Sequence, residues 1–576
     1  MPDAGEIKRI RSASLVTSGT GKKTFGQGSL EVRNGLRVLR LRGSHYETGY
    51  QHGILLREEI RHGVGTYYGN PMENFAPFKH MSVMKRYLVK MYFDWKIYRP
   101  LMKATPKHYL SEMKGIADGS GLTFAEIFHG NMYSELNMNL VKVLEQEYFG
   151  QVASACTTFV AFNEATTDGA LIMGRNTDYS GGGLWDKYQT VMIYEPKDAY
   201  RFVNLSSAGI IKCNSCMNEK KICIGAHFLP LNDTTPHGIS LTYLELEIMK
   251  RASSIDEAIA IIKGNPRVGA FAFTLADGKT NGAAVVECSA SKVGVRRADG
   301  NVIWETNVST TNEIKPVDVL LRNGIGKNPI ARFERMRTLM QENMGKINPQ
   351  VAAKIMGDHM DMCSGTIRPA GGIIAQVINL TSAVFRPATL DFWAAHGPTP
   401  MCHNAYTGFN LMQELDGKGS SVEPAILDPN DYVQSDSYKA LRKYHEALVS
   451  SMVPPTDEEA ALKRLEEAIA LKPDEAIYRR IVSQMLIRKG DAAKATEHLR
   501  RAIECEQSRN ELAQTYLFFG FANDLAGKRN EAIKCYEKVL QMADSGEANV
   551  LADVNPLVIA DAGRRLKVPF RPKDAT

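Results

Sequence analysis

The stretch that decides the fold begins with SACTTF at residues 154–159 and continues with TDGALIMGRNTD at residues 167–178. The first run is typical of a β-strand, the Asp-Gly pair is a turn signal, and ALIMGRN predicts a returning strand. Such a hairpin brings Arg175 and Asp178 back to the start of the first strand, beside Cys156. A thiol, a guanidinium and a carboxylate at one strand end are compatible with a nucleophilic site, and equally with a purely structural cluster.

Composition and charge place the chain in a broad class. Of its 576 residues, 44% are apolar and 23% are charged, which is typical of a globular protein with two or three domains. A net charge of +6 over this length does not indicate a nucleic-acid partner. The first residues contain no apolar run of the length that a secretory signal peptide needs. We therefore expect a cytoplasmic protein without a membrane span and without a nucleic-acid partner.

The cysteines do not form a recognisable framework. Nine of them are spaced irregularly in a chain that is too long to need disulfide bonds, so we expect most to be reduced and buried. Cys213 and Cys216 form a single CxxC motif with Cys223 further on, and no second pair follows to complete four zinc ligands. The pattern predicts neither a metal site nor a cofactor.

Periodicity predicts a mixed α+β region. Residues 29–42 alternate apolar and polar positions like a half-buried strand, and a long helical tract follows at 45–140. Short β-branched or aromatic runs separated by turn pairs extend from 156 to 308. Helical tracts at 241–263 and 330–345 interrupt them, so helices and sheets share one α+β unit.

The C-terminal part has a different character. A Gly-, Ser- and Pro-rich connection at 416–435 precedes a helix at about 436–452. Beyond it, the run AALKRLEEAIALKPDEA from residue 460 is echoed from residues 493 and 531. A repeat of about 34 residues with small side chains at helix contacts resembles tetratricopeptide repeats, and an ordinary helical bundle is the alternative.

Further motifs raise the significance of the hairpin. Together with it, they resemble the acyl-coenzyme A:6-aminopenicillanic acid acyltransferase (isopenicillin N acyltransferase) family, whose wider relatives include choloylglycine hydrolases and acid ceramidase. The resemblance covers about residues 29 to 410. The motifs are GSHYETGYQHG at 43–53, EIFHGN at 126–131, MNEK at 217–220, ETN at 305–307 and RFER at 332–335.

The resemblance implies an N-terminal-nucleophile hydrolase with an αββα sandwich. In such an enzyme the thiol of Cys156 attacks the carbonyl of Ala155, and hydrolysis of the resulting ester frees a new amino terminus on the cysteine. The free α-amine, which titrates near pH 8, then serves as the base for its own thiol. We therefore expect autocatalytic cleavage between Ala155 and Cys156.

The resemblance also implies roles for three polar residues. Asp178 would hold the new ammonium group, and Arg175 would favour the thiolate by lowering its pKa. Asn307 would donate to the oxyanion of the tetrahedral intermediate. A turn residue at the end of a strand is the structural alternative for Asn307.

Two further positions have open interpretations. His227 stands where relatives often have a second oxyanion-side asparagine, so it is an oxyanion donor, a residue of the substrate pocket or a satisfied core histidine. Arg332 orients the nucleophile, binds a substrate carboxylate or forms a surface ion pair.

The predicted function is that of a self-processing amidohydrolase or acyltransferase that acts on a small N-acyl amide without a cofactor. The alternative is a catalytically silent scaffold whose helical repeats at 456–545 bind a partner protein or a second copy. A papain-like protease is disfavoured because its local cysteine motif is missing. The expected order is an N-terminal tail (1–28), a mostly helical prodomain (29–155), the catalytic region (156–415), a linker with a helix (416–455), tetratricopeptide-like repeats (456–545) and a C-terminal tail (546–576).

Overall fold

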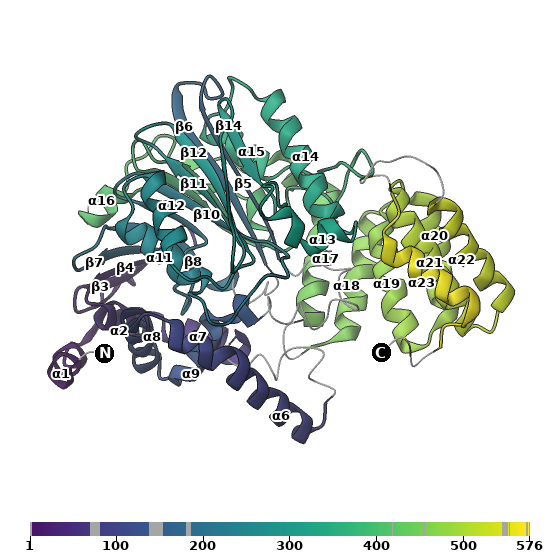
Figure 1. Cartoon of the computed structure of the whole chain (residues 1–576), viewed down its shortest axis with the longest axis horizontal. Coiled ribbons are helices and arrows are strands. Elements are labelled where there is room, and N and C mark those ends of the chain that lie inside the picture. Colours follow the sequence, from purple (N-terminus) through teal and green to yellow (C-terminus); the bar gives the residue numbers. More distant parts are fainter. Residues whose placement is uncertain are drawn as a thin grey trace. The chain divides into compact units, whose positions relative to one another are not determined.

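A computed structural model of the whole chain is shown in Figure 1. The chain folds into two compact units. The first unit comprises residues 1–319, 338–357 and 378–430, and the second comprises 320–337, 358–377 and 431–576. The residues that the structure describes are 3–68, 81–136, 154–179, 186–417, 419–452, 456–543, 551, 553–571 and 574.

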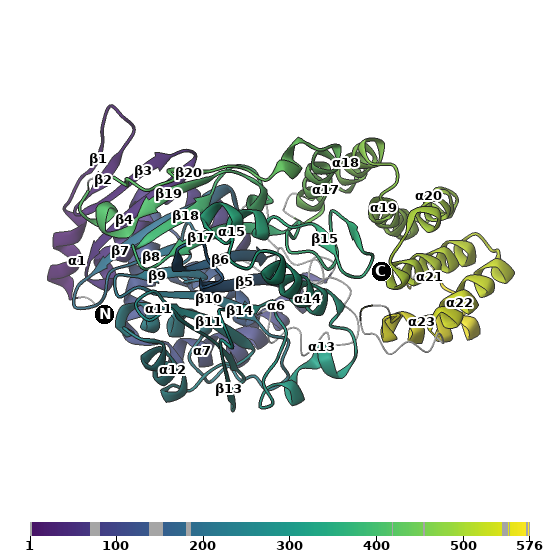
Figure 2. The same cartoon turned by 90° about the horizontal axis from the view of Figure 1, so that it is seen from above.

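The first unit is built on two sheets, one of eleven strands and one of seven. All strand pairs are antiparallel except β4 with β7. The larger sheet has the order β1 (Leu15–Thr17), β2 (Lys23–Phe25), β3 (Gly28–Arg33), β4 (Leu36–Gly43), β7 (Gln189–Pro196), β8 (Phe202–Ser207), β9 (Ser215–Asn218), β10 (Ile222–Phe228), β11 (Phe271–Asp277), β12 (Gly282–Cys288) and β13 (Val293–Arg297). The smaller sheet has the order β14 (Val302–Glu305), β5 (Ser154–Asn163), β6 (Gly169–Tyr179), β17 (Asn379–Arg386), β18 (Asp391–Ala395), β19 (Tyr406–Asn410) and β20 (Ile426–Leu427), as Figure 2 shows from above.

Helices cover the outer faces of both sheets (Figure 1). The larger sheet is covered by α2 (His45–Leu55), α11 (Leu241–Arg251) and α12 (Ile255–Gly264), with α8 (Lys107–Ser120) packed on α2. The smaller sheet is covered by α15 (Pro349–Met356). This arrangement confirms the predicted αββα sandwich. The other helices among the described residues of this unit are α1 (Ala4–Arg11), α3 (Arg57–Ile60), η1 (Arg61–Tyr68), α6 (Val83–Phe93), η2 (Asp94–Tyr98), α7 (Arg99–Ala104), α9 (Phe124–Asn131), η3 (Asp186–Tyr188), η4 (Lys315–Val317), η5 (Met401–His403) and α16 (Leu411–Leu415).

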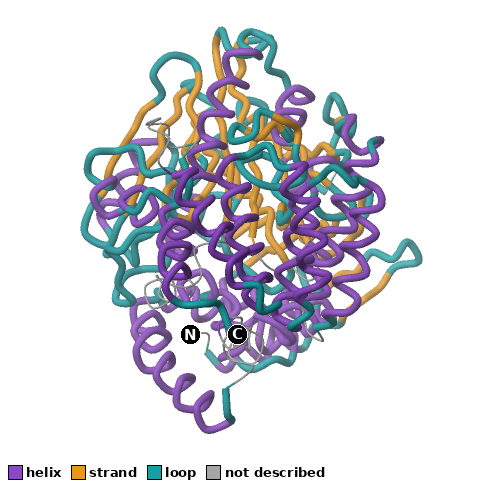
Figure 3. Tube along the Cα trace, turned by 90° about the vertical axis from the view of Figure 1, so that its right-hand side faces the viewer, coloured by secondary structure: helices purple, strands orange, loops and turns teal. Residues whose placement is uncertain are grey.

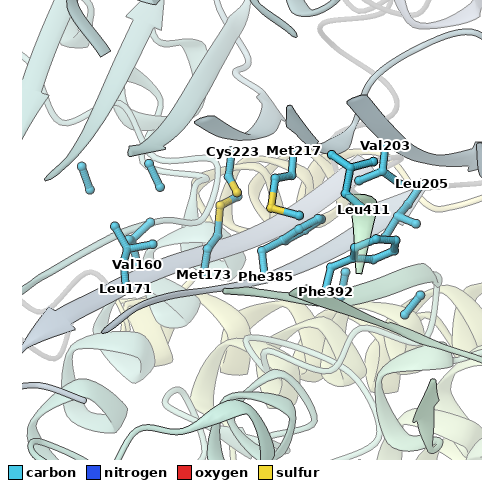
Figure 4. Close-up of a cluster of buried hydrophobic side chains, with 14 of the residues drawn as sticks. Val160, Leu171, Met173, Val203, Leu205, Met217, Cys223, Phe385, Phe392 and Leu411 are labelled. Atoms are coloured by element: carbon cyan, nitrogen blue, oxygen red, sulfur yellow. The ribbon is translucent and has the colours of Figure 1, made fainter. Parts of the chain in front are cut away.

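The main core lies between the two sheets. Val160 and Met173 of the smaller sheet and Met217 and Cys223 of the larger sheet point toward one another in Figure 4, and all four are fully buried. Alternate residues of β5 and β6 belong to this cluster because successive side chains of a strand point to opposite faces. The same alternation places the polar side chains of Thr158 on β5 and Arg175 on β6 between the sheets.

The spaced glycines of the motif at 43–53 let two helices approach each other closely. A Cβ atom at Gly53 of α2 would lie 2.5 Å from the carbonyl oxygen of Ile116, and one at Gly49 would overlap the carbonyl of Glu112. On α8, a Cβ atom at Gly119 would lie 2.6 Å from the carbonyl oxygen of Tyr50. Glycines on both helices are therefore required by backbone-to-backbone packing.

Two polar residues of the same motif attach α2 to its surroundings. Gln51 accepts a hydrogen bond from the backbone N–H of Arg42 at 3.0 Å and donates one to the Arg42 carbonyl at 2.9 Å. His52 is fully buried and accepts from the N–H of Gly209 at 2.9 Å. Burial lowers the pKa of His52 to about 4, so the ring stays neutral and keeps this acceptor at physiological pH.

The prediction of a single strand at 29–42 is wrong. The structure has two strands, β3 and β4, joined by a tight turn at Asn34 and Gly35, whose φ angles are 50° and 83°. An Asn-Gly pair favours this turn because both residues tolerate positive φ. The alternation of apolar and polar residues resumes in phase after the turn, so it hid the break.

The second unit is dominated by antiparallel helices, which Figure 3 shows in purple. The predicted all-helical C-terminal region is confirmed. The segments 320–337 and 358–377 contribute most of α13 (Val319–Arg322), most of α14 (Lys327–Glu342) and the small hairpin of β15 (Met360–Asp361) and β16 (Thr366–Ile367). The remaining elements are η6 (Asp431–Gln434), α17 (Asp436–Met452), α18 (Glu458–Leu471), α19 (Ala476–Lys489), α20 (Ala492–Cys505), α21 (Arg509–Leu525), α22 (Arg529–Ala543) and α23 (Pro556–Lys567).

A buried arginine ties the hairpin segment to the helices of this unit. Arg368 forms ion pairs of 2.6 Å with both Glu475 and Glu506. Burial alone would lower the pKa of Arg368, but the two carboxylates outweigh it and raise the pKa above its usual value. Removing one partner of such a buried network leaves a desolvated charge without compensation, which is strongly destabilising.

The glycine contact gives a first prediction. Gly49→Ala should lower the free energy of unfolding by about 1–3 kcal/mol, because the methyl group would overlap the backbone of α8. Gly563→Ala is the matched control, since a Cβ atom there meets nothing within 4 Å inside α23. That control should be neutral or more stable by up to about 1 kcal/mol. Denaturant unfolding monitored by circular dichroism measures both, and equal effects would contradict the packing role.

Candidate active site

The hairpin of β5 and β6 brings Arg175 and Asp178 back to the strand end that carries Cys156, as the sequence predicted. Cys156 lies opposite Thr177, and Ala155 lies opposite Asp178. Paired residues in an antiparallel ladder share a face, and neighbouring residues along a strand do not. Cys156 and Asp178 therefore sit at the same strand end on opposite faces of the smaller sheet.

The two faces meet different surroundings. Toward the larger sheet, Thr158 and Arg175 form a cross-strand pair, with a hydrogen bond of 3.1 Å from the guanidinium to the hydroxyl. On the opposite face, Asp178 accepts a hydrogen bond of 2.7 Å from the side chain of Asn379. Asn379 in turn accepts from the backbone N–H of Cys402 at 2.8 Å. The thiol thus shares its face with the arginine, while the carboxylate is held from β17.

Arg175 is a fully buried cation whose partners are neutral. Its guanidinium donates to Thr158 and to the carbonyl of Ala226, and it lies 3.4 Å from the ring of His227. No carboxylate forms an ion pair with it in the part of the chain that the structure describes. A buried charge without an opposite partner is costly and is typical of functional sites. Arg175 is therefore well suited to stabilise an anion that forms during a reaction.

His227 completes a polar cluster beside β5. It lies in β10, is fully buried, and its Nε2 atom is 2.9 Å from the Thr158 hydroxyl and 3.2 Å from the Thr274 hydroxyl. These contacts place the ring in the same cluster as Arg175. Of the three expected roles, these contacts favour the satisfied core histidine.

Asn307 binds the backbone nitrogen of Cys156. Its Oδ1 atom accepts from the backbone N–H of Cys156 at 2.7 Å, and its Nδ2 atom donates to the carbonyl of Phe228 at 2.7 Å. A backbone N–H can only donate and a carbonyl can only accept, so these two partners fix the orientation of the amide. Asn307 has a φ of 73°, a strained conformation that is often found at functional sites.

A buried carboxylate supports the loop that carries Asn307. Glu305 accepts from the backbone N–H groups of Thr306 and Val308 at 3.1 and 2.9 Å. Burial and the nearby carboxylate of Glu287 raise the pKa of Glu305 to about 8, and Arg296 partly opposes this shift. Glu305 therefore binds a proton in the folded protein across much of the neutral range.

Arg332 belongs to the second unit and not to the unit that carries Cys156. It is fully buried in α14, and its guanidinium donates to the side chain of Asn328 at 2.9 Å, one helical turn earlier. A surface ion pair, one of the expected alternatives, is thus excluded. The other two roles, orientation of the nucleophile and binding of a substrate carboxylate, stay predictions.

Sequence reasoning missed three residues that shape this site. Thr158 stands inside the motif, yet its link between Arg175 and His227 depends on the packing of two sheets. Glu305 precedes Asn307, and only its burial makes it unusual. Asn379 lies far along the chain from Asp178, and no sequence signal connects them.

The described ranges contain no group of three or more His, Cys, Asp or Glu side chains that could hold a metal ion. The structure describes all nine cysteines; none of them forms a disulfide bond, and seven are buried. No helix in the described part of the chain combines the length and the apolar character that crossing a membrane requires.

Most residues of this site lie in a segment that matches a known protein family. Residues 165–398 match the family of acyl-coenzyme A:6-aminopenicillanic acid acyl-transferases. The predicted resemblance is thereby confirmed for this segment. The acyl-transferase match includes Arg175, Asp178, His227, Asn307 and Arg332, and Cys156 lies just before it.

Several individual proteins are similar to the chain. An uncharacterized protein of Archaeoglobus fulgidus is 24% identical over 502 residues, which cover 82% of this chain and 79% of the relative. Protein dcd1B and protein dcd1A of Dictyostelium discoideum are 25% and 27% identical, each over 46% of this chain. These matches span about half to three fifths of the Dictyostelium proteins, 52% and 60%.

Three solved structures have some similarity to the chain. An N-acylethanolamine-hydrolyzing acid amidase ortholog from Caenorhabditis elegans is 13% identical and covers 40% of this chain and 93% of its own. Penicillin V acylase from Agrobacterium tumefaciens is 14% identical, with coverages of 45% and 87%. A conjugated bile acid hydrolase from Clostridium perfringens is 15% identical, with coverages of 46% and 97%, and the TM-score is 0.30 in each case.

The raised pKa of Glu305 predicts a pH-dependent stability. An unfolded glutamate has a pKa of about 4.3, so between there and pH 8 the folded protein keeps a proton that the unfolded chain has released. The free energy of unfolding should therefore fall as pH rises through this window.

Glu305→Gln retains the acceptor oxygen and removes the titration. The stability of the variant relative to wild type should rise from pH 5 to pH 8, by at most about 1.4 kcal/mol per pH unit. Thermal unfolding of both proteins across this range measures the difference. Parallel curves would show that Glu305 titrates normally.

Proposed function

We propose that this protein is a cysteine N-terminal-nucleophile enzyme that cleaves its own chain before Cys156 and then hydrolyses or transfers the acyl group of an N-acyl amide. The observation that carries the proposal is the hydrogen bond of 2.7 Å from the Cys156 N–H to Asn307. It holds the nitrogen of the bond to be cleaved, while the thiol of Cys156 shares its face with the buried cation of Arg175. The acyl-transferase match supports acyl chemistry at this site.

The self-processing step needs only groups of the chain and water. The Cys156 sulfur attacks the carbonyl carbon of Ala155, the C–N bond breaks, and the thiol proton passes to the departing nitrogen. Water then hydrolyses the thioester, which leaves a carboxylate on Ala155 and restores the thiol. The new α-amine is the nitrogen that Asn307 already holds, so cleavage creates the base in its working position.

In each turnover, the α-amine takes the thiol proton and the thiolate attacks the substrate carbonyl. The ammonium returns the proton to the leaving amine, and water or a second amine releases the acyl group from Cys156. Asp178 lies opposite Ala155 in the ladder, beside the point where the ammonium forms. Arg175 would favour the thiolate from the other face. The oxyanion role of Asn307 remains part of this proposal.

A scaffold without catalysis is the weaker alternative. A protein that only scaffolds would not need a strained Asn307 on the nucleophile nitrogen or a buried Arg175 without a carboxylate partner. The second unit suits an additional binding role. Helices α18, α20 and α22 begin at Glu458, Ala492 and Arg529 and alternate with antiparallel partners. This spacing supports tetratricopeptide-like repeats that bind a partner protein or a second copy.

Nine cysteines without a disulfide bond support a reducing, cytoplasmic location for the enzyme. The name of the matched acyl-transferase family describes transfer of an acyl group to an amine, which supports a substrate with an acyl–amine linkage. We therefore propose small N-acyl amides as substrates.

Self-processing gives a direct prediction. The wild type should separate into fragments of residues 1–155 and 156–576 under denaturing conditions, and Cys156→Ala should stay a single chain. Cys288→Ala, which also removes a fully buried thiol, is the control and should be cleaved like the wild type. Denaturing electrophoresis with intact-mass measurement resolves these species. Cleavage of the Cys156→Ala protein at the same position would contradict the mechanism.

The anchoring role of Asn307 is testable in the same assay. Asn307→Ala frees the Cys156 nitrogen, and the resulting misplacement should slow cleavage by about 10–100-fold. Asn301→Ala changes a more exposed residue of the same segment and should be cleaved at the wild-type rate. The appearance of fragments during cell-free synthesis gives both rates. If Asn307→Ala were cleaved at the wild-type rate, Asn307 would not position the Cys156 nitrogen for cleavage.

A further inference from the structure

The helix α6 carries a continuous exposed apolar face. Among its described residues only Phe93 is buried. The exposed apolar side chains recur at helical spacing along α6 and into η2, so they lie on one side. Their exposed fractions range from 51% to 75%. They are Val83, Met84, Tyr87, Leu88, Met91, Tyr92 and Trp95.

Basic side chains border this face on both sides. On a helical wheel, Lys90 falls at one edge of the apolar stripe and Lys85 at the other. Lys96 lies over the ring of Trp95, with its ammonium 4.7 Å from the ring centre. The stretch 81–104 contains a single acidic residue, Asp94, which is 3.8 Å from His129. Its basic residues are Lys85, Arg86, Lys90, Lys96, Arg99 and Lys103.

We infer that this face, defined by the seven apolar residues and their flanking lysines, docks on a membrane surface that contains anionic lipids. An interfacial helix places aromatic and aliphatic side chains among the lipid headgroups, and lysines at the edges of the face reach the phosphates. Each basic residue near an anionic surface adds to the attraction.

The charge pattern argues against a second copy as the occupant. A two-fold symmetric contact would pair this face with itself and bring Lys85 and Lys90 close to their own counterparts. Protein interfaces are also depleted in lysine. An anionic lipid surface complements both the apolar face and its positive border.

The docking face is structurally connected to the catalytic end of the sandwich. Tyr98 of η2 stacks on His129 of α9 with ring centres 4.0 Å apart. Just after α9, Tyr133 contacts Tyr179 edge-on at 5.6 Å, and Tyr179 is the residue after Asp178. Docking would therefore place a membrane on a segment that contacts the strand end of the proposed site.

Sedimentation with vesicles of phosphatidylcholine, with and without phosphatidylserine, tests the inference on the full chain. The wild type should bind vesicles that contain phosphatidylserine, more strongly at low salt than at high salt. The double variant Leu88→Ser with Met91→Ser should lose this binding. Lys85→Glu with Lys90→Glu should weaken it by at least about tenfold. Val32→Ser changes an apolar residue of similar exposure (68%) on β3 and should bind like the wild type.

Three outcomes would overturn the inference. The first is the absence of wild-type binding to vesicles, and the second is equal binding by the Leu88 and Met91 double variant. The third is a wild-type dimer in gel filtration that does not bind vesicles and that this variant abolishes, which would assign the face to a second copy. Cys156→Ala should bind vesicles normally, so failure of the proposed catalysis and failure of docking are separable.

Discussion

The pairing of β5 with β6 is the constraint on which the site depends. Its register places Thr158 beside Arg175 and Ala155 beside Asp178, and a slip of one residue would turn every side chain to the wrong face. The apolar residues further along the same strands fix that register, because Val160 and Met173 must face the larger sheet to be buried. Core packing at one end of the hairpin thus determines polar geometry at the other.

The polar residues at that end are shared between the two sheets. Asn307 connects the Cys156 nitrogen to the carbonyl of Phe228, which is the last residue of β10. Arg175 reaches from β6 to the carbonyl of Ala226 in the same strand. Cys156 is therefore positioned by contacts across the sandwich, and the geometry around it requires both sheets to be in place. The hydroxyl of Thr158 and the carbonyl of Ala226 accept hydrogen bonds from the Arg175 guanidinium, and because both are neutral they leave its positive charge uncompensated.

Local sequence signals predicted the hairpin and a mixed α+β region well, whereas the αββα class came from the resemblance to the acyltransferase family. They did so because turn chemistry and strand alternation are short-range properties. The same signals failed at residues 29–42, where the alternation continued in phase through the turn at Asn34 and Gly35. They also marked the spaced glycines only as part of a motif, because Gly53 and Gly119 acquire their meaning when α2 meets α8. The partners of Asp178 and Arg368 come from distant segments, and no spacing rule connects them. The sequence did not indicate the exposed apolar face of α6 either, because a run of apolar residues at helical spacing is typical of a buried helix.

The proposed mechanism turns the backbone nitrogen of Cys156 into the catalytic base. The most direct measurement is therefore labelling of free amines on the native protein, followed by peptide mass spectrometry. The proposed cleavage predicts a labelled α-amine on a peptide that begins with Cys156, followed by Thr157 and Thr158. An active enzyme in which the peptide spanning Ala155 and Cys156 remains intact and unlabelled would contradict it.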